Sequence, residues 1–199
     1  MPRDQNRSRR DDLLLHLLVL RCQTGDGDAF ARLFDGFGAR TLRYLRGLVG
    51  DEADDVHQEL WLTVYRRIGQ LERPGSFVTW LFRTARHRAV DHLRRRRRER
   101  ELLEDLALAS AAGDEVVSDP ELERPAASVL DAAAAALPTP QREVLLLRYQ
   151  DELSYDEIAL VVGCSVGTVK SRLHHARRRL HVLLEQAGDA HARPTLSPP

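Results

Sequence analysis

Apolar residues recur along this chain at the spacing of α-helices, and no stretch shows the alternation of polar and apolar residues that is typical of β-strands. The pattern is clearest near the C-terminus, where apolar residues are separated by steps of three and four: Val166, Val169, Leu173, Ala176 and Leu180. Such steps place side chains on one face of a helix. The pattern therefore predicts an all-α fold.

Gly, Pro and polar residues divide this helical pattern into two units. Residues 13–100 predict four helices, with breaks near 24–28, 47–51 and 69–76. Residues 128–187 predict a second, smaller helical domain, in which Thr139 and Pro140 are typical of a helix start.

The segments outside these two units have other compositions. Residues 101–127 are acidic and rich in alanine, which indicates a flexible linker, although 101–109 could extend the preceding helix. We expect residues 1–12 and 188–199 to be disordered tails.

Residues 153–180 predict a helix-turn-helix. Ser154 and Glu157 have the spacing of a capping box, in which the hydroxyl and the carboxylate bind backbone N–H groups at the helix start. Gly163 then suits the left-handed backbone that ends a helix, and Ser165 can cap the next helix.

The second helix of this motif has a polar face without acids, since no Asp or Glu occurs between Ser165 and Leu184. A helix of this kind can enter the major groove of DNA with its N-terminal residues near the base edges. A basic helical hairpin also occurs in ordinary helix bundles, where it is a solvated face, and this alternative stays open.

The net charge is zero, from 30 Lys and Arg against 30 Asp and Glu, but the charges are segregated. Arginines crowd residues 83–100, including five in a row at 94–98, whereas acids collect at 51–59 and 99–123. Separate acidic and basic blocks indicate more than one macromolecular surface.

The helix predicted at residues 54–68 has two different flanks. Val56, Leu60 and Val64 form one, which suits the core, and Asp55, Glu59 and Leu62 form the other. The second flank could be an acidic and apolar surface for a protein partner. The alternative is that the acids only favour the helix N-terminus.

The next predicted helix combines aromatic residues with arginines. Rings that stack on bases and guanidinium groups that pair with phosphates would suit a nucleic-acid surface. The alternative is that Phe77, Trp80 and Leu81 belong to the core, and for Trp80 we prefer that interpretation.

Several classes of protein are disfavoured. The two cysteines, Cys22 and Cys164, are far apart and lack the spacing of a metal site or a disulfide framework. No apolar run reaches about 18 residues, so we expect neither a transmembrane helix nor membrane binding. A signal peptide is also unexpected.

We find no nucleophile, metal cluster or phosphate-binding glycine loop in the sequence. We therefore expect a cytoplasmic protein without cofactor, small-molecule substrate or enzymatic activity.

Five segments in order resemble bacterial sigma factors of the extracytoplasmic-function (ECF) group of the sigma-70 family, over residues 25–186. They are GDGDAFARLFDGF, DDVHQELWLTVYRRI, GSFVTWLFRTARHRAVDHLRRRRR, LPTPQREVLLLRY and LSYDEIALVVGCSVGTVKSRLHHARRRL. The resemblance implies a transcription initiation factor. Its region 2 would bind the β′ clamp helices of core RNA polymerase and open the −10 promoter element. Its region 4 would recognise the −35 element and contact the β flap. The family often uses an anti-sigma factor as a further partner.

The resemblance also implies roles for particular residues. The polymerase-binding helix would present Asp55, Gln58, Glu59 and Leu62. The loop at 71–77 would hold a base flipped from the −10 element and the next helix would follow the promoter strand, with the residues Leu71, Pro74, Ser76, Phe77, Arg83, Arg86, His87 and Arg88. Contacts to the −35 element would come from Ser165, Thr168, Lys170, Ser171, Arg172, His174, His175 and Arg178, with Arg172 and Arg178 on phosphates.

Some positions depart from the family pattern. His57 replaces an aliphatic residue, His87 replaces an asparagine, and Lys170 replaces an arginine, which removes the bidentate fork that guanine favours. The promoter sequence therefore stays open. Two other functions also stay open: a self-sufficient helix-turn-helix regulator that binds DNA as a dimer, and a helical adaptor that binds only proteins.

Overall fold

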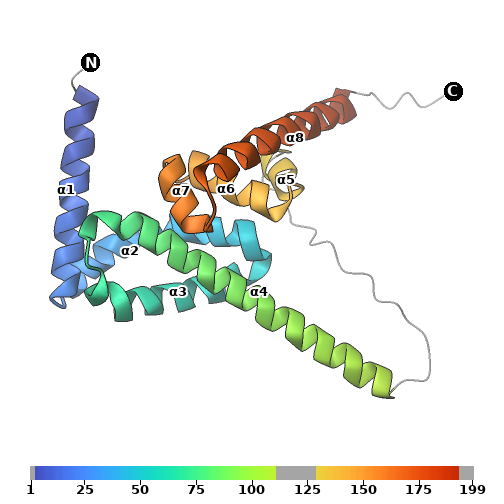
Figure 1. Ribbon diagram of the computed structural model, residues 1–199, viewed down its shortest axis with the longest axis horizontal. Helices are drawn as coiled ribbons and strands as arrows, with labels where there is room; N and C mark the ends of the chain where they lie inside the picture. The colour runs from blue at the N-terminus through green and yellow to red at the C-terminus, as the bar shows by residue number, and fades with distance from the viewer. Residues whose placement is uncertain (1–2, 111–128, 193–199) are drawn as a thin grey trace. The chain divides into compact units, whose positions relative to one another are not determined.

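The computed structural model describes residues 3–110 and 129–192, with the side chains of 10–104 and 132–187. All regular structure in these residues is helical. The chain forms two compact units, the first built by α1 to α4 and the second by α5 to α8 (Figure 1). The predicted all-α fold with two helical domains is confirmed.

The first unit has four α-helices, as the sequence predicts, with short 3₁₀ turns between them. In order these are α1 (Arg3–Gln23), α2 (Gly27–Val49), η1 (Gly50–Glu52), α3 (Ala53–Arg67), η2 (Ile68–Gln70), η3 (Pro74–Ser76) and α4 (Phe77–Ser110). The second unit contains α5 (Val129–Ala135), α6 (Thr139–Tyr149), α7 (Tyr155–Val162) and α8 (Val166–Ala192).

The core of the first unit lies between α2, α3 and α4. Tyr44, Leu60 and Phe82 contribute one fully buried side chain from each of these helices. The rings of Tyr44 and Phe82 meet edge to face with centroids 5.4 Å apart, a favourable arrangement for aromatic rings. This core fixes α3 and α4 side by side, so their outer faces form the surfaces considered below.

The helix-turn-helix of the second unit forms through the predicted local signals. Both bonds of the Ser154–Glu157 capping box are present. Gly163 ends α7 in the left-handed conformation, with φ 69° and ψ 43°, and the Thr168 N–H donates to Ser165 Oγ over 3.1 Å at the start of α8. Val169, Leu173 and Ala176 form the buried stripe of α8, which packs on α6.

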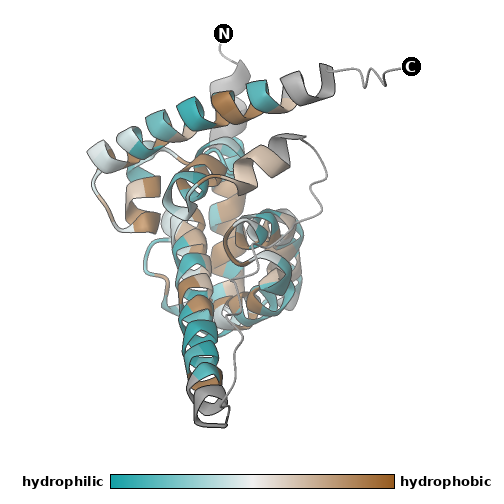
Figure 2. Cartoon of the chain, turned by 90° about the vertical axis from the view of Figure 1, so that its right-hand side faces the viewer, coloured by the Kyte–Doolittle hydropathy of each residue, from teal (hydrophilic) through white to brown (hydrophobic). Residues whose placement is uncertain are grey.

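The helices reach into three segments that were expected to be tails or linker. α1 begins at Arg3, in the expected tail 1–12, and α8 reaches Ala192, past the expected end at 187. α4 continues to Ser110, which agrees with the alternative that 101–109 extends the preceding helix. Arg, Glu, Leu and Ala are strong helix formers, and adding a residue to an existing helix is much easier than nucleating one. Figure 2 shows that the distal part of α4 is largely hydrophilic. Residues 1–2, 111–127 of the linker and 193–199 of the tail lie outside the described residues.

Candidate nucleic-acid and protein interfaces

The two flanks of α3 are separated as their spacing predicts. Val56, Leu60 and Val64 are buried in the core. Leu62 is 50% exposed, and the other residues proposed for polymerase binding are exposed or half-buried beside it: Asp55, Gln58 and Glu59. α3 therefore presents one continuous acidic and apolar surface.

An apolar groove of about 480 Å³ lies beside this surface, between α2 and α3. Aromatic side chains build it: the Trp61 ring meets Phe30 at 5.8 Å and Phe34 at 5.0 Å between centroids, and Tyr65 meets Phe30 at 5.2 Å. Gln58 and Leu62 also line the groove. The groove was not predicted from the sequence, although the helical spacing of Phe30 and Phe34 in α2 places both rings on one face.

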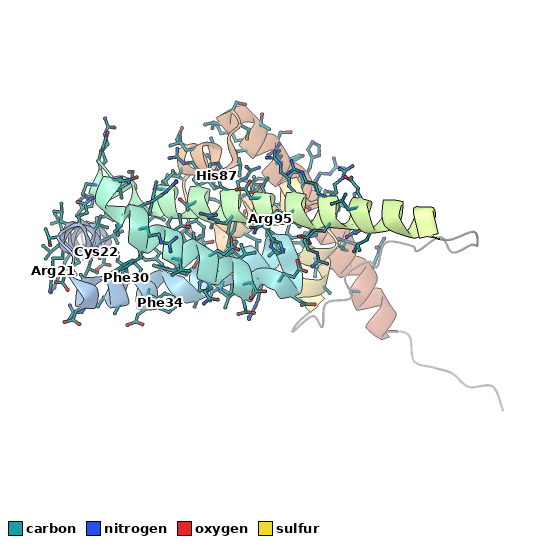
Figure 3. The ribbon with its side chains drawn as sticks, turned by 90° about the horizontal axis from the view of Figure 1, so that it is seen from below. Arg21, Cys22, Phe30, Phe34, His87 and Arg95 are labelled. Carbon is teal, nitrogen blue, oxygen red and sulfur yellow. The ribbon has the colours of Figure 1, made fainter. Side chains whose placement is uncertain are left out.

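Figure 3 labels Phe30 and Phe34 on one side of the first unit and His87, in α4, on the other. Phe30 and Phe34 therefore lie on a different side of the first unit from His87.

His57 lies in the wall of this groove and is held by polar contacts. Its Nε2 lies 3.0 Å from the carbonyl oxygen of Gly38 and 3.1 Å from Thr41 Oγ1, and the Trp61 indole N–H donates to it over 2.9 Å. Burial lowers the pKa of His57 below its ordinary value of 6.5, although the bond that the protonated ring would donate to the Gly38 carbonyl and the charge of Asp54 act in the opposite direction. These contacts explain how a polar ring fits at a position where the family resemblance implied an aliphatic residue.

Stability is expected to depend on pH through His57. Because the pKa is lower in the folded chain, the unfolded chain binds more protons as the pH falls below about 6.5. The free energy of unfolding should therefore fall as the pH is lowered from 6.5 through the folded pKa. Urea unfolding at a series of pH values should show a flatter dependence in His57→Leu than in the wild type. His87→Leu changes an exposed histidine, and its free energy of unfolding should keep the wild-type dependence on pH. Equal slopes in all three chains would contradict the assignment of this pH dependence to His57.

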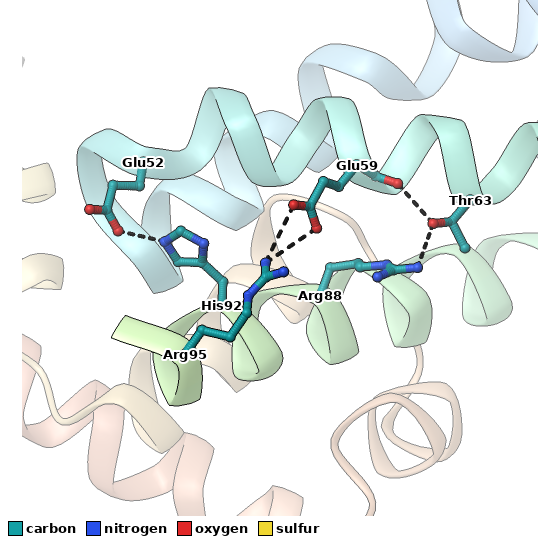
Figure 4. Close-up of polar contacts among 6 residues, drawn as sticks. All are labelled: Glu52, Glu59, Thr63, Arg88, His92 and Arg95. Atoms are coloured by element: carbon teal, nitrogen blue, oxygen red, sulfur yellow. Dashed lines mark hydrogen bonds and ion pairs between the residues drawn. The ribbon is translucent and has the colours of Figure 1, made fainter. Parts of the chain in front are cut away.

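Polar contacts join η1 and α3 to the basic helix α4 (Figure 4). Arg95 lies 3.4 Å from the carboxylate of Glu59, and His92 lies 2.5 Å from that of Glu52. Arg88 donates to Thr63 Oγ1 over 2.8 Å. The arginine run at 94–98 thus has a carboxylate neighbour on α3 as well as solvent. Exposed ion pairs of this kind add little stability.

A second cavity, of about 340 Å³, lies at the start of α4 beside the loop that follows α3. It combines an aromatic ring with arginines, and its lining residues are Arg67, Gln70, Leu71, Glu72, Arg73, Ser76, Trp80 and Arg83. Three predicted −10 residues line it, Leu71, Ser76 and Arg83. Pro74 lies in the adjacent η3 turn.

Two aromatic residues near this cavity differ from expectation. Phe77 is fully buried, with its ring 5.4 Å from that of Phe37, so it does not face a nucleobase and belongs to the core. Trp80, which we placed in the core, is only half-buried and lines the cavity. One turn of α4 separates the two rings, and which of them faces the cavity depends on contacts with distant helices.

The remaining α4 residues differ in their exposure. His87 and Arg83 are exposed, Arg86 is half-buried, and the guanidinium of Arg88 is turned toward Thr63 on α3. Arg83 and His87 are therefore the described side chains best placed to follow a nucleic-acid strand beyond the cavity.

The recognition helix α8 presents the predicted basic face. Its exposed residues include Lys170, Ser171, His174, His175 and Arg178. Three other predicted residues have local partners: Ser165 and Thr168 share a hydrogen bond of 2.9 Å between their hydroxyls, and Arg172 lies 4.0 Å from the sulfur of Cys164. The exposed set lies on the face opposite the buried stripe, as major-groove binding requires.

Among the described residues, no group of His, Cys, Asp and Glu could hold a metal ion. None of the described helices is both long and apolar enough to cross a membrane.

Comparisons with known proteins match both units. Residues 33–99 match the family model for sigma-70 region 2, and residues 128–180 match that for sigma-70 region 4. The chain is 35% identical over 181 residues to the RNA polymerase sigma-H factor of Pseudomonas aeruginosa, covering 84% of this chain and 92% of that protein. It is 29% identical over 181 residues to the ECF sigma factor SigW of Bacillus subtilis, covering 85% and 96%.

A solved structure is also similar to this chain. The sigma factor RpoE of Bartonella quintana, in complex with the anti-sigma factor NepR, superposes with a TM-score of 0.63 at 25% identity. The match covers 78% of this chain and 96% of that one.

Proposed function

This chain belongs to the ECF group of sigma-70 factors, which direct RNA polymerase to promoters, and we propose that its surfaces divide that task. The first unit binds core polymerase through α3 and a flipped −10 base through the cavity at the start of α4. The second unit recognises the −35 element through α8. The observation that carries this proposal is the cavity walled by Trp80 and three arginines, Arg67, Arg73 and Arg83.

Polymerase binding is supported by the surface of α3 and its groove. Exposed apolar side chains beside a groove mark a protein-binding site, because burial there removes apolar area from water. The acids of α3 add charge complementarity, which mainly sets partner choice and association rate. Among the predicted contacts, Gln58 and Leu62 line the groove directly, so we place them at its centre with Asp55 and Glu59 at its rim.

Base capture is supported by the chemistry of the cavity. Extruding a base from the stack costs a few kcal/mol, and a fitted pocket must offset this cost. The ring of Trp80 supplies a surface on which any base can stack, worth about 1–3 kcal/mol per base. Guanidinium groups of Arg67, Arg73 and Arg83 at the cavity wall can pair with the neighbouring phosphates.

Binding of the −35 element is supported by the exposed face of α8. Lys170, Ser171 and His174 lie near the helix N-terminus, the part that reaches base edges in helix-turn-helix proteins. Arg178 lies two turns later and is placed for a phosphate. Both units bind the same polymerase, so their separate DNA contacts add through effective concentration.

Partners and location follow from the same proposal. The Bartonella relative is bound by an anti-sigma factor, and we infer that a protein inhibitor can cover the α3 groove of this chain as well. Because core polymerase works in the cytoplasm, the chain acts there. Phosphodiester chemistry belongs to the polymerase, and the chain itself is not an enzyme.

The role of the cavity can be tested with Trp80→Ala. Loss of the stacking surface should reduce open-complex formation by the complete holoenzyme about tenfold, in line with the energy of one base stack. The measurement is permanganate reactivity of the melted −10 region. Trp80→Tyr keeps an aromatic ring and serves as the matched control, which should retain most of the activity. Equal activity of Trp80→Ala and the wild type would contradict the role of the cavity.

A further inference from the structure

The side chain of Gln23, the last residue of α1, binds the loop that forms the base cavity. Its amide nitrogen donates to the carbonyl oxygen of Ile68 over 3.1 Å and to that of Leu71 over 2.7 Å. A glutamine amide has two N–H donors, and both are used here. Leu71 lines the cavity, so Gln23 binds the backbone of a cavity residue that lies 48 positions later in the sequence.

A second residue of α1 reaches the other end of the same loop. A side chain at Gly75 would place its Cβ 2.6 Å from Nε2 of His16, so the imidazole fills the space that glycine leaves. His16 and Gln23 are seven residues apart, two turns of helix, and therefore share one face of α1. α1 thus meets the loop near both ends, because it contacts both η2 and η3.

α1 is itself firmly placed on the first unit. Val19 and Cys22 are buried against its core. Arg21 forms an ion pair of 2.6 Å with Asp26, which in turn caps α2 by accepting the Ala29 N–H over 3.0 Å. α1 can therefore hold the loop in a fixed position.

The loop needs such support. Most of the cavity lining comes from it, yet the backbone between Leu71 and Arg73 is in neither a helix nor a 3₁₀ turn. A pocket whose walls become ordered only on binding has a lower affinity for its ligand, because the ordering costs entropy. A preorganised pocket avoids this cost.

We propose that Gln23 and His16 are positioning residues for the base cavity, through which α1 keeps the loop at 68–76 in its base-accepting shape. α1 then contributes to promoter opening although neither residue lines the cavity. This inference rests on the proposed function, because it assumes that the cavity binds a flipped −10 base.

Gln23→Leu removes both donors and keeps a side chain of similar size. We expect capture of the flipped base to fall about tenfold, since two backbone carbonyls lose a hydrogen-bond partner. Gln23→Lys keeps a donor on a flexible chain and should restore part of the activity. Asp11→Asn, an exposed change on α1, is the matched control and should behave as the wild type.

The test uses complete holoenzyme with purified core polymerase and promoter DNA that carries 2-aminopurine, whose fluorescence rises when it leaves the base stack. Scanning the −10 element with wild-type protein first identifies the flipped position. The same variants are then compared by their rates of initiation on the complete template and on a template that lacks the base at that position, since an abasic site gives no fluorescence. If Gln23 acts through the pocket, its defect appears on the complete template and disappears on the abasic one.

The possible outcomes separate the two proposals. No base flipping and no initiation by the wild type would contradict the proposed function itself. A normal wild type with an unchanged Gln23→Leu would overturn the positioning role, and so would a Gln23→Leu defect of equal size on both templates, which would indicate general destabilisation. Gly75→Ala is an independent probe: its Cβ would displace the imidazole of His16 from the loop, so it should weaken capture, and adding His16→Ala should cause no further loss. Additive losses in the double variant would contradict the contact at η3.

Discussion

Replacing Leu62 by aspartate is expected to lower the affinity of this sigma factor for core RNA polymerase about thirtyfold while leaving the fold intact. Leu62 is 50% exposed and lines the aromatic groove between α2 and α3. Residues at the centre of a protein interface often contribute about 2 kcal/mol or more, which corresponds to about thirtyfold in affinity. A carboxylate there would also be buried without a partner when the complex forms.

Fluorescence titration of labelled core polymerase would measure this effect, with urea unfolding as the check on folding. Leu102→Asp is the matched control, because Leu102 is also an exposed leucine, 61% accessible, but lies on the distal part of α4. It should bind polymerase as the wild type does. Equal losses of affinity in both variants, or a normal affinity of Leu62→Asp, would contradict the placement of the polymerase interface on α3.

Lys170→Glu is expected to reduce initiation at a promoter with a −35 element about thirtyfold. Lys170 is exposed near the N-terminus of α8, on a face that carries no acid, and its Nζ lies 5.9 Å from the centre of the Tyr155 ring. A direct base contact contributes about 1–3 kcal/mol of discrimination. The introduced carboxylate adds repulsion from phosphates, and the expected thirtyfold loss corresponds to about 2 kcal/mol, the middle of that range.

The promoter itself supplies one control for this prediction. On a template that is already melted and lacks the −35 element, Lys170→Glu should initiate as well as the wild type. Arg179→Glu makes the same charge change further along α8. It should reduce initiation at the complete promoter less than threefold, because Arg179 lies beyond the proposed contacts. Abortive-initiation assays give these rates. A loss that persists without the −35 element would contradict the assignment of α8.

The features predicted best from sequence are those with local physical causes. The caps of α7 and α8 depend on hydroxyl, carboxylate and glycine residues within a few positions, so Ser154, Gly163 and Ser165 could be assigned directly. The two flanks of α3 follow from helical periodicity alone. The family resemblance then connected these elements to a function that the comparisons confirm.

The features missed depend on contacts between distant segments. Phe77 and Trp80 have similar sequence surroundings, but only packing against α2 decides that Phe77 is buried and that Trp80 faces a cavity. The groove needs rings from two helices. Gln23 gives no signal of its own, because its partners are backbone carbonyls 45 and 48 residues away. Helix extensions into the two expected tails were missed, and the extension into the linker was only an alternative, because composition alone does not separate exposed helix from disorder.

The most direct test of this account is transcription by purified bacterial core polymerase on a pool of promoter fragments, with and without this protein, followed by sequencing of the transcripts. We expect initiation that depends on the protein, at start sites that share −35 and −10 elements. Binding of duplex DNA by the protein alone, as a dimer and without initiation, would contradict it and favour a self-sufficient regulator. Absence of both initiation and salt-dependent DNA binding would contradict it in favour of a protein-binding adaptor.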